Sequence, residues 1–280
     1  MFGAIIGDIV GSRFEFNNVK TKDFGNLFTS DCFFTDDTVM TLAVAKSIVE
    51  YYKQDELKVR LPDFVQMNMQ EMGQKYKHRG YGTMMLQWIN SKKPVPYNSF
   101  GNGAVMRISP VAEVSYDVYS AKYMAEDVTN VTHNHPESIK AVKAVMDVIF
   151  ALKRDIPLED IRYMVKREYY PEMDENFTLE KIRKDYKFDE TCQGSVPQAL
   201  QAFFESTSFE DAIRNAISIG GDSDTIACIV GMIAEHKYKI PDNLKLMALN
   251  YLDKDMKKII KDFYILIGGF NRRWASYQNK

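Results

Sequence analysis

Apolar residues recur at spacings of three and four along most of the chain, which is the period of an amphipathic helix. This pattern predicts helices over residues 38–53, 136–153, 197–205, 209–219, 223–236, 242–250 and 254–266. Pro136 suits the first turn of its helix, and Pro241 follows the end of the 223–236 helix. Few stretches alternate apolar and polar residues as a half-buried strand does. The sequence therefore predicts an all-α protein with mostly short connections.

The N-terminal stretch is apolar and carries glycine at positions 3, 7 and 11. Glycine at every fourth residue of a helix lets a second helix approach closely, so we expect tight packing here. The stretch is not a dinucleotide-binding motif, because no strand precedes it and the glycine spacing differs. Glu15 follows between two phenylalanines. It is either a partly exposed surface residue or a desolvated acid with a raised pKa.

Length and composition are those of an ordinary soluble globular protein. The 280 residues contain no low-complexity linker, so we expect one domain over residues 1–280. A formal charge of −2 predicts no bulk attraction to nucleic acid or to an anionic membrane. The scattered cysteines, Cys32, Cys192 and Cys228, fit a reducing cytoplasm. The first residues lack the basic region of a signal peptide, and no run reaches the ~18 apolar residues of a membrane span.

Two acidic clusters, each opening a predicted helix, are the most informative feature. They are Thr35-Asp36-Asp37-Thr38 and Gly220-Gly221-Asp222-Ser223-Asp224-Thr225. Either cluster alone is typical of helix capping, because its oxygens accept hydrogen bonds from free N–H groups. Two such clusters brought together would repel each other unless a cation lay between them. Oxygen ligands without His or Cys favour magnesium, manganese or calcium over zinc, which indicates metal-assisted chemistry.

Three further segments are ambiguous from the residues alone. The loop containing Gly101, Asn102 and Gly103 either cradles a phosphate or forms an ordinary Asn-Gly turn. Tyr81 lies in a similar glycine-flanked turn and could offer its ring to a base or ribose. His133 precedes a helix start, where it contacts ligand or backbone. The charged stretch 167–190 is a solvated helical pair or a lid over a site.

Taken in order, these segments resemble the motifs of the ADP-ribosylglycohydrolase family, which includes the dinitrogenase reductase-activating glycohydrolases. The match spans roughly residues 1–236, and its specificity lies in the order of the motifs. They are Gly7-Asp8 with Gly11 and Glu15, Thr35-Asp36-Asp37-Thr38, Gly80-Tyr81-Gly82, Gly101-Asn102-Gly103 with Met106-Arg107, Thr132-His133 with His135-Pro136, Pro197-Gln198-Ala199-Leu200, and Gly220-Gly221-Asp222-Ser223-Asp224-Thr225.

The resemblance implies an all-α fold with a cleft that holds two Mg²⁺ or Mn²⁺ ions. The implied metal ligands are Thr35, Asp36, Asp37, Asp222, Asp224 and Thr225. It also implies that ADP-ribose is the bound moiety. Glu15 would lie beside the scissile bond, Gly101, Asn102 and Gly103 near the diphosphate, and His133 near the ligand.

The expected reaction is metal-dependent hydrolysis of the bond between the distal ribose and an acceptor, with Glu15, Asp36 and Asp222 as catalytic residues. The substrate would be an ADP-ribosylated protein or a small ADP-ribose conjugate, with Tyr81 among the contacts. Neither the acceptor nor the role of Glu15 as acid or base follows from the sequence. A two-metal nucleotide phosphohydrolase would use the same carboxylates. A non-catalytic ADP-ribose binder is the other alternative, although the intact acidic clusters argue against it.

Overall fold

The protein is all-α, as its hydrophobic pattern predicts. The computed structural model describes residues 1–56 and 58–278, and side chains as far as residue 269. Within these residues no strand forms, and the extended pairing is an isolated bridge between Gly101 and Thr191. The buried hydrophobic core draws on residues from Met1 to Phe263. The chain is therefore held together by packing between helices.

Helices follow one another closely along the chain. The first part contains α1 (Phe2–Gly11), η1 (Ser12–Phe14), α2 (Asp36–Lys53), α3 (Leu61–Lys75), α4 (Thr83–Ile89), η2 (Asn102–Ala104), α5 (Ser109–Val114) and α6 (Val118–Asn130). The second part contains α7 (Pro136–Leu152), α8 (Leu158–Glu168), α9 (Leu179–Asp185), α10 (Cys192–Phe204), α11 (Phe209–Ser218), α12 (Ser223–Ala234), α13 (Asp242–Asn250) and α14 (Lys254–Gln278).

The predicted helices are all present, and two of them differ from the predicted bounds by more than two residues at one end. The helix expected to start at residue 197 begins at Cys192, because Thr191 caps it by accepting a hydrogen bond from the Gly194 N–H. Pro197 lies inside that helix and not at its start. The last helix continues past residue 266 as far as Gln278.

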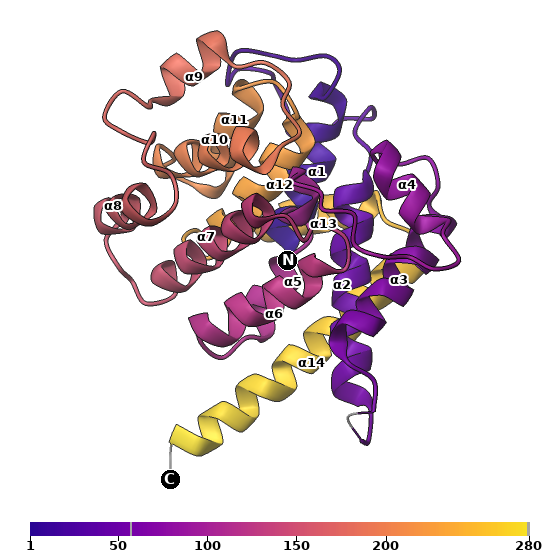
Figure 1. Cartoon of the computed structure of the whole chain (residues 1–280). Helices are drawn as coiled ribbons and strands as arrows, with labels where there is room; N and C mark the ends of the chain where they lie inside the picture. Colours follow the sequence, from indigo (N-terminus) through magenta and orange to yellow (C-terminus); the bar gives the residue numbers. More distant parts are fainter. Residues whose placement is uncertain (57, 279–280) are drawn as a thin grey trace.

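Helices α1 and α12 pack against each other in the middle of the molecule. Figure 1 shows α2 and α3 on one side of this pair and α7, α10 and α11 on the other. A Cβ atom on Gly7 would lie 2.0 Å from the Ala227 carbonyl oxygen, and one on Gly11 would lie 2.5 Å from the Asp224 Cα. The glycine spacing therefore does permit a close helix pair, as predicted. It also brings the end of α1 beside the start of α12.

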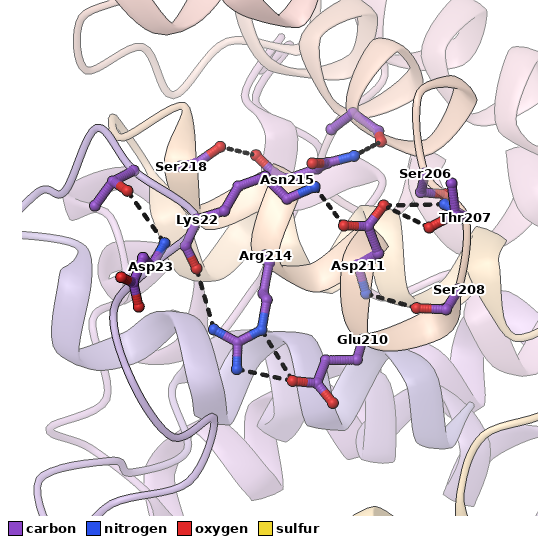
Figure 2. Close-up of polar contacts among 12 residues, drawn as sticks. Lys22, Asp23, Ser206, Thr207, Ser208, Glu210, Asp211, Arg214, Asn215 and Ser218 are labelled. Carbon is purple, nitrogen blue, oxygen red and sulfur yellow. Dashed lines mark hydrogen bonds and ion pairs between the residues drawn. The ribbon is translucent and has the colours of Figure 1, made fainter.

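The long loop between η1 and α2, residues 15–35, is fastened to α11. Arg214 donates hydrogen bonds to the carbonyls of Lys22 (3.1 Å) and Gly25 (2.9 Å). Lys22 in turn forms an ion pair with Asp211, and Figure 2 shows this network. Because both ends of the loop carry candidate site residues, these contacts help to position the site.

The charged stretch 167–190 contains the last two residues of α8 and all of α9, so it holds one complete helix and not the helical pair expected there. Its last part reaches the second acidic cluster. Gly221 has φ +74°, and a Cβ atom on it would lie 2.4 Å from Tyr186 Cε1. The Lys20 side chain donates to the Tyr186 carbonyl over 2.7 Å. The stretch is therefore an edge of the candidate site as well as a surface excursion.

Two expectations from composition can be compared with the structure. Cys32, Cys192 and Cys228 are all buried and free. Among the described helices, none combines the length and the apolar character that crossing a membrane requires.

Candidate metal centre and ligand site

The two acidic clusters meet, although they are far apart in the sequence. Asp37 lies in the first turn of α2, and its Oδ2 accepts a hydrogen bond from Thr225 Oγ1 in the first turn of α12, over 3.1 Å. Carboxylate oxygens of Asp8, Asp37 and Asp224 all lie within 4.8 Å of one another, and all three residues are buried. The helix starts therefore form one concentrated group of negative charge.

Glu15 and Asp222 extend this group on one side. Their carboxylate oxygens and one of Asp224 also lie within 4.8 Å of one another. Burial, followed by the negative charges of Asp222 and Asp8, raises the pKa of Glu15 to about 7. Glu15 combines features of the two interpretations given by the sequence, because it is partly exposed and its pKa is raised.

Two buried carboxylate oxygens have no partner. Asp37 Oδ1 and Asp224 Oδ1 make no hydrogen bond to any described residue. Burial and then the neighbouring carboxylates raise the pKa of both side chains well above the ordinary value. Unpaired buried charge is costly, and a cation relieves it. The unpaired oxygens and the all-oxygen surroundings fit a hard divalent cation such as Mg²⁺ or Mn²⁺.

Asp8 is a central residue of this group that the sequence analysis did not include among the metal ligands. It lies fully buried on α1 and accepts hydrogen bonds from Thr35 Oγ1 (2.7 Å), the Thr35 N–H (3.1 Å) and the Thr38 N–H (3.0 Å). Burial raises its pKa to about 6, against the lowering effect of these bonds. The sequence signal that could have identified Asp8 is its position as an acidic residue within an otherwise apolar helix. Asp8 joins α1 to the start of α2.

Asp36 lies at the edge of the carboxylate group, whereas the Thr35 hydroxyl contacts both Asp8 and Asp37 within it. Thr35 caps α2, accepting from the Asp37 N–H over 3.3 Å. Asp36 is half-buried, and its backbone N–H donates to the Arg79 carbonyl over 2.7 Å. Burial and then Asp8 raise the pKa of Asp36 well above its ordinary value. Asp36 belongs to neither set of three clustered carboxylates, so its position is more peripheral than that of Asp37.

Asn102 ties the Gly101–Gly103 loop to the second acidic cluster. Its Nδ2 donates to Asp222 Oδ2 over 2.6 Å and to Ser195 Oγ over 3.0 Å. Its backbone N–H donates to the Glu190 carbonyl over 2.8 Å. The sequence allowed this loop to be either an ordinary turn or a phosphate cradle. In the structure it lines one side of the candidate site.

His133 lies behind the same loop. Its side chain is 6% exposed, and a Cβ atom on Gly101 or Gly103 would lie 3.5 or 3.4 Å from His133 Nε2. Burial and then the Arg107 guanidinium hold the pKa of His133 well below its usual range, so the imidazole is neutral. His135 has a different task, because its Nδ1 accepts from the backbone N–H two residues on and caps α7.

Tyr81 lies near the first cluster, with its side chain buried. Its hydroxyl has no hydrogen-bond partner among the described residues. Burial and then the negative charge of Asp36 raise its pKa. Because the side chain is only 7% exposed, its unpaired hydroxyl is a better candidate for ligand contact than its ring face.

Asn18 connects the Glu15 loop to the second acidic turn, and no sequence pattern singled it out. Its Oδ1 accepts from the Gly221 N–H over 2.7 Å, and its Nδ2 donates to the Gly221 carbonyl over 3.0 Å. The same Nδ2 lies 2.9 Å from the Glu15 carbonyl, to which it also donates. This contact holds the backbone of Glu15 close to Asp222.

Comparisons with known proteins agree with the fold and the motifs. The ADP-ribosylglycohydrolase family model matches residues 1–269. ADP-ribosylhydrolase ARH3 of Xenopus tropicalis is 24% identical, with 91% of each chain covered. The ADP-ribosyl-(dinitrogen reductase) glycohydrolase of Rhodospirillum rubrum is 24% identical, with 92% of this chain and 90% of the relative covered. The solved structure of an ADP-ribosylglycohydrolase-related protein complex has a similar fold, with a TM-score of 0.63, 21% identity, and 95% and 97% of the two chains covered.

Proposed function

Because this chain belongs to the ADP-ribosylglycohydrolase family, we propose that it hydrolyses the glycosidic bond between ADP-ribose and an acceptor with the help of Mg²⁺ or Mn²⁺. The names of the relatives, which describe hydrolysis of ADP-ribosyl linkages, support this class of bond. The observation that carries the cation requirement is the pair of buried, unpaired oxygens on Asp37 and Asp224.

The proposed cation ligands are the oxygens at the two helix starts. Asp37 and Asp224 are the strongest candidates, because each has an unpaired oxygen. The full proposed set is Thr35, Asp36, Asp37, Asp222, Asp224 and Thr225, for one ion or two. A bound divalent cation would orient the ribose hydroxyls and lower the pKa of a water molecule.

Glu15 is the proposed proton-transfer residue. With a pKa of about 7 in the cation-free protein, it is present there in both protonation states near neutral pH. Glycoside hydrolysis needs an acid for the leaving group and a base for the attacking water, and such a group suits either task. Asn18 holds its backbone near Asp222. We assign Glu15, Asp36 and Asp222 to the surroundings of the reacting ribose.

ADP-ribose would be bound beside the carboxylates by the surrounding loops. Gly101, Asn102 and Gly103 are the proposed neighbours of the diphosphate, with His133 and Tyr81 as further contacts. The link from Asn102 to Asp222 supports this placement, because it brings that loop to the carboxylates. The proposed substrate is an ADP-ribosylated protein or a small ADP-ribose conjugate.

Product analysis tests the proposed reaction. Peptides ADP-ribosylated on arginine or on serine are incubated with the protein in Mg²⁺ and, separately, in EDTA, and the products are identified by mass spectrometry. Release of free ADP-ribose in Mg²⁺ alone is the expected result. Release of AMP or phosphate would instead indicate a nucleotide phosphohydrolase. Binding without any turnover of either peptide or of small ADP-ribose conjugates would indicate a binding protein.

A further inference from the structure

Arg107, Thr132 and His133 form a hydrogen-bonded chain behind the Gly101–Gly103 loop. Arg107 Nη2 donates to Thr132 Oγ1 over 2.6 Å, and Thr132 Oγ1 lies 2.7 Å from His133 Nδ1. Arg107 and Thr132 are completely buried, and His133 is nearly so. Because Thr132 has no access to water, its hydroxyl hydrogen needs an acceptor inside the protein.

The direction of the hydrogen bonds follows from what each group can donate. A guanidinium only donates, so Thr132 Oγ1 accepts from Arg107. The hydroxyl of Thr132 has a single hydrogen, and among the described residues His133 Nδ1 is the acceptor it contacts. If Nδ1 carried the ring proton instead, the buried hydroxyl hydrogen would have no acceptor, at a cost of about 1–3 kcal/mol. The arrangement in which both the Thr132 hydroxyl hydrogen and His133 Nδ1 have a partner has an unprotonated Nδ1.

A neutral imidazole with an unprotonated Nδ1 carries its hydrogen on Nε2. The burial of His133 and the positive charge of Arg107 both favour the neutral ring. Of the His133 atoms, Nε2 lies nearest to a Cβ atom placed on Gly101 (3.5 Å) or on Gly103 (3.4 Å). No described residue accepts a hydrogen bond from it, so a ligand oxygen is the partner that the site lacks.

We propose that Arg107 and Thr132 are positioning residues that fix His133 as the neutral Nε2–H tautomer, so that His133 donates a hydrogen bond to an oxygen of the bound ligand. The tautomer follows from the chain of hydrogen bonds alone. The identity of the ligand, ADP-ribose, rests on the proposed function. A doubly protonated His133 would need Thr132 to accept twice and would place a second positive charge beside buried Arg107.

Nitrogen-15 NMR on the ligand-free protein tests the tautomer directly. The chain has four histidines, and a His133→Gln variant identifies the signals of this ring. We expect a directly bonded proton on Nε2 and none on Nδ1 at pH 7. A proton on Nδ1, or on both nitrogens, would overturn the assignment. The tautomer is read from the unaltered protein, and the variant serves only to assign the signals of His133.

Two variants, Thr132→Val and Thr132→Ser, distinguish the effect of the Thr132 hydroxyl from the effect of side-chain shape. Valine has nearly the same shape but lacks the donor, so it should admit the Nδ1–H tautomer and weaken ADP-ribose binding about tenfold, the equivalent of about 1.4 kcal/mol. Serine keeps the hydroxyl and should retain the wild-type tautomer and affinity to within about twofold. An unchanged tautomer in Thr132→Val would exclude a role for the hydroxyl in selecting it.

Titration of ADP-ribose with Mg²⁺ into the labelled wild-type protein tests the donor role. The Nε2 and Hε2 signals of His133 should shift as the ligand binds. Binding without a shift at Nε2 would exclude the donor role and leave the proposed function standing. Absence of binding would contradict the proposed function and the donor role together, while the tautomer result would stand by itself.

Discussion

Thr225 Oγ1 donates a hydrogen bond to Asp37 Oδ2 over 3.1 Å, joining the first turns of two helices whose contacting residues are 188 positions apart. Thr225 relieves only part of the charge that this contact concentrates, because the other oxygen of Asp37 has no partner. Ordinary helix capping explains neither the unpaired oxygens nor the number of carboxylates. The proposed divalent cation would explain both.

Asp224→Asn should weaken Mn²⁺ binding by at least about tenfold, because it removes one charged ligand where negative charge is concentrated. Calorimetric titration with Mn²⁺ measures the effect. Asp242→Asn is the matched control, since Asp242 also opens a helix but its side chain is 77% exposed. Equal Mn²⁺ affinity of wild type and Asp224→Asn would remove Asp224 from the ligand set.

The contribution of Asp8 and Glu15 to the stability of the cation-free protein should fall as the pH rises from about 4 to about 7. The pKa of Asp8 is raised to about 6 and that of Glu15 to about 7, so both groups bind protons more tightly in the folded state. Their contribution is complete below the ordinary carboxyl pKa of about 4 and is lost as the pH passes the raised values.

Added Mg²⁺ should reverse that loss. At about 100 times its Kd, a ligand adds about 2.7 kcal/mol, or roughly 5 °C in Tm for a chain of this size. Thermal unfolding in Mg²⁺ and in EDTA should therefore differ more at pH 8 than at pH 5. A Mg²⁺ effect that is independent of pH would contradict the account of the buried carboxylates.

Glu15→Gln should lower kcat by about 10²–10⁴-fold, because an amide transfers no proton at this position. ADP-ribose affinity in Mg²⁺ should change little, since the amide preserves the shape of the side chain. Steady-state kinetics and calorimetry on the same preparation separate the two effects, with Glu56→Gln on the exposed surface as a control. Turnover at the wild-type rate would exclude Glu15 from the chemistry.

Gly7→Ala should destabilise the protein by about 1–3 kcal/mol or more, because the new methyl group would overlap the Ala227 carbonyl of α12. Denaturant unfolding gives the change in the free energy of unfolding. Gly82→Ala is the control, since nothing lies within 4 Å of a Cβ atom at that position. A Gly7→Ala protein as stable as the Gly82→Ala protein would show that α1 and α12 are not closely packed.

Much of the fold could be predicted from local sequence signals. The glycines of α1 predicted a close helix pair because a missing side chain directly determines how near another backbone can come. The extension of α10 back to Cys192 was missed, because Pro197 is typical of a helix start and the Thr191 cap precedes it. Proline is common near helix starts but also occurs inside helices. The Thr191 cap was therefore the more reliable sign of where α10 begins.

The site was only partly predictable for a similar reason. Asp36, Asp37, Asp222 and Asp224 could be proposed from the sequence, because two acids next to each other or two positions apart at a helix start form a local pattern. Asp8 was not included among the proposed ligands. A single acid in an apolar helix can be assigned to the site only when its contacts with Thr35 and Thr38 are known. The bonds of Asn18 to Gly221, 203 positions away, depend wholly on the tertiary fold.

The most direct test is a calorimetric titration of ADP-ribose into the wild-type protein, first with Mg²⁺ and then with EDTA. We predict that ADP-ribose binds with Mg²⁺ and that its affinity falls by at least about tenfold in EDTA, because the ligand and the buried carboxylates would share the cation. Equal affinity in both solutions would contradict a shared cation site. No binding in either would contradict ADP-ribose as the ligand.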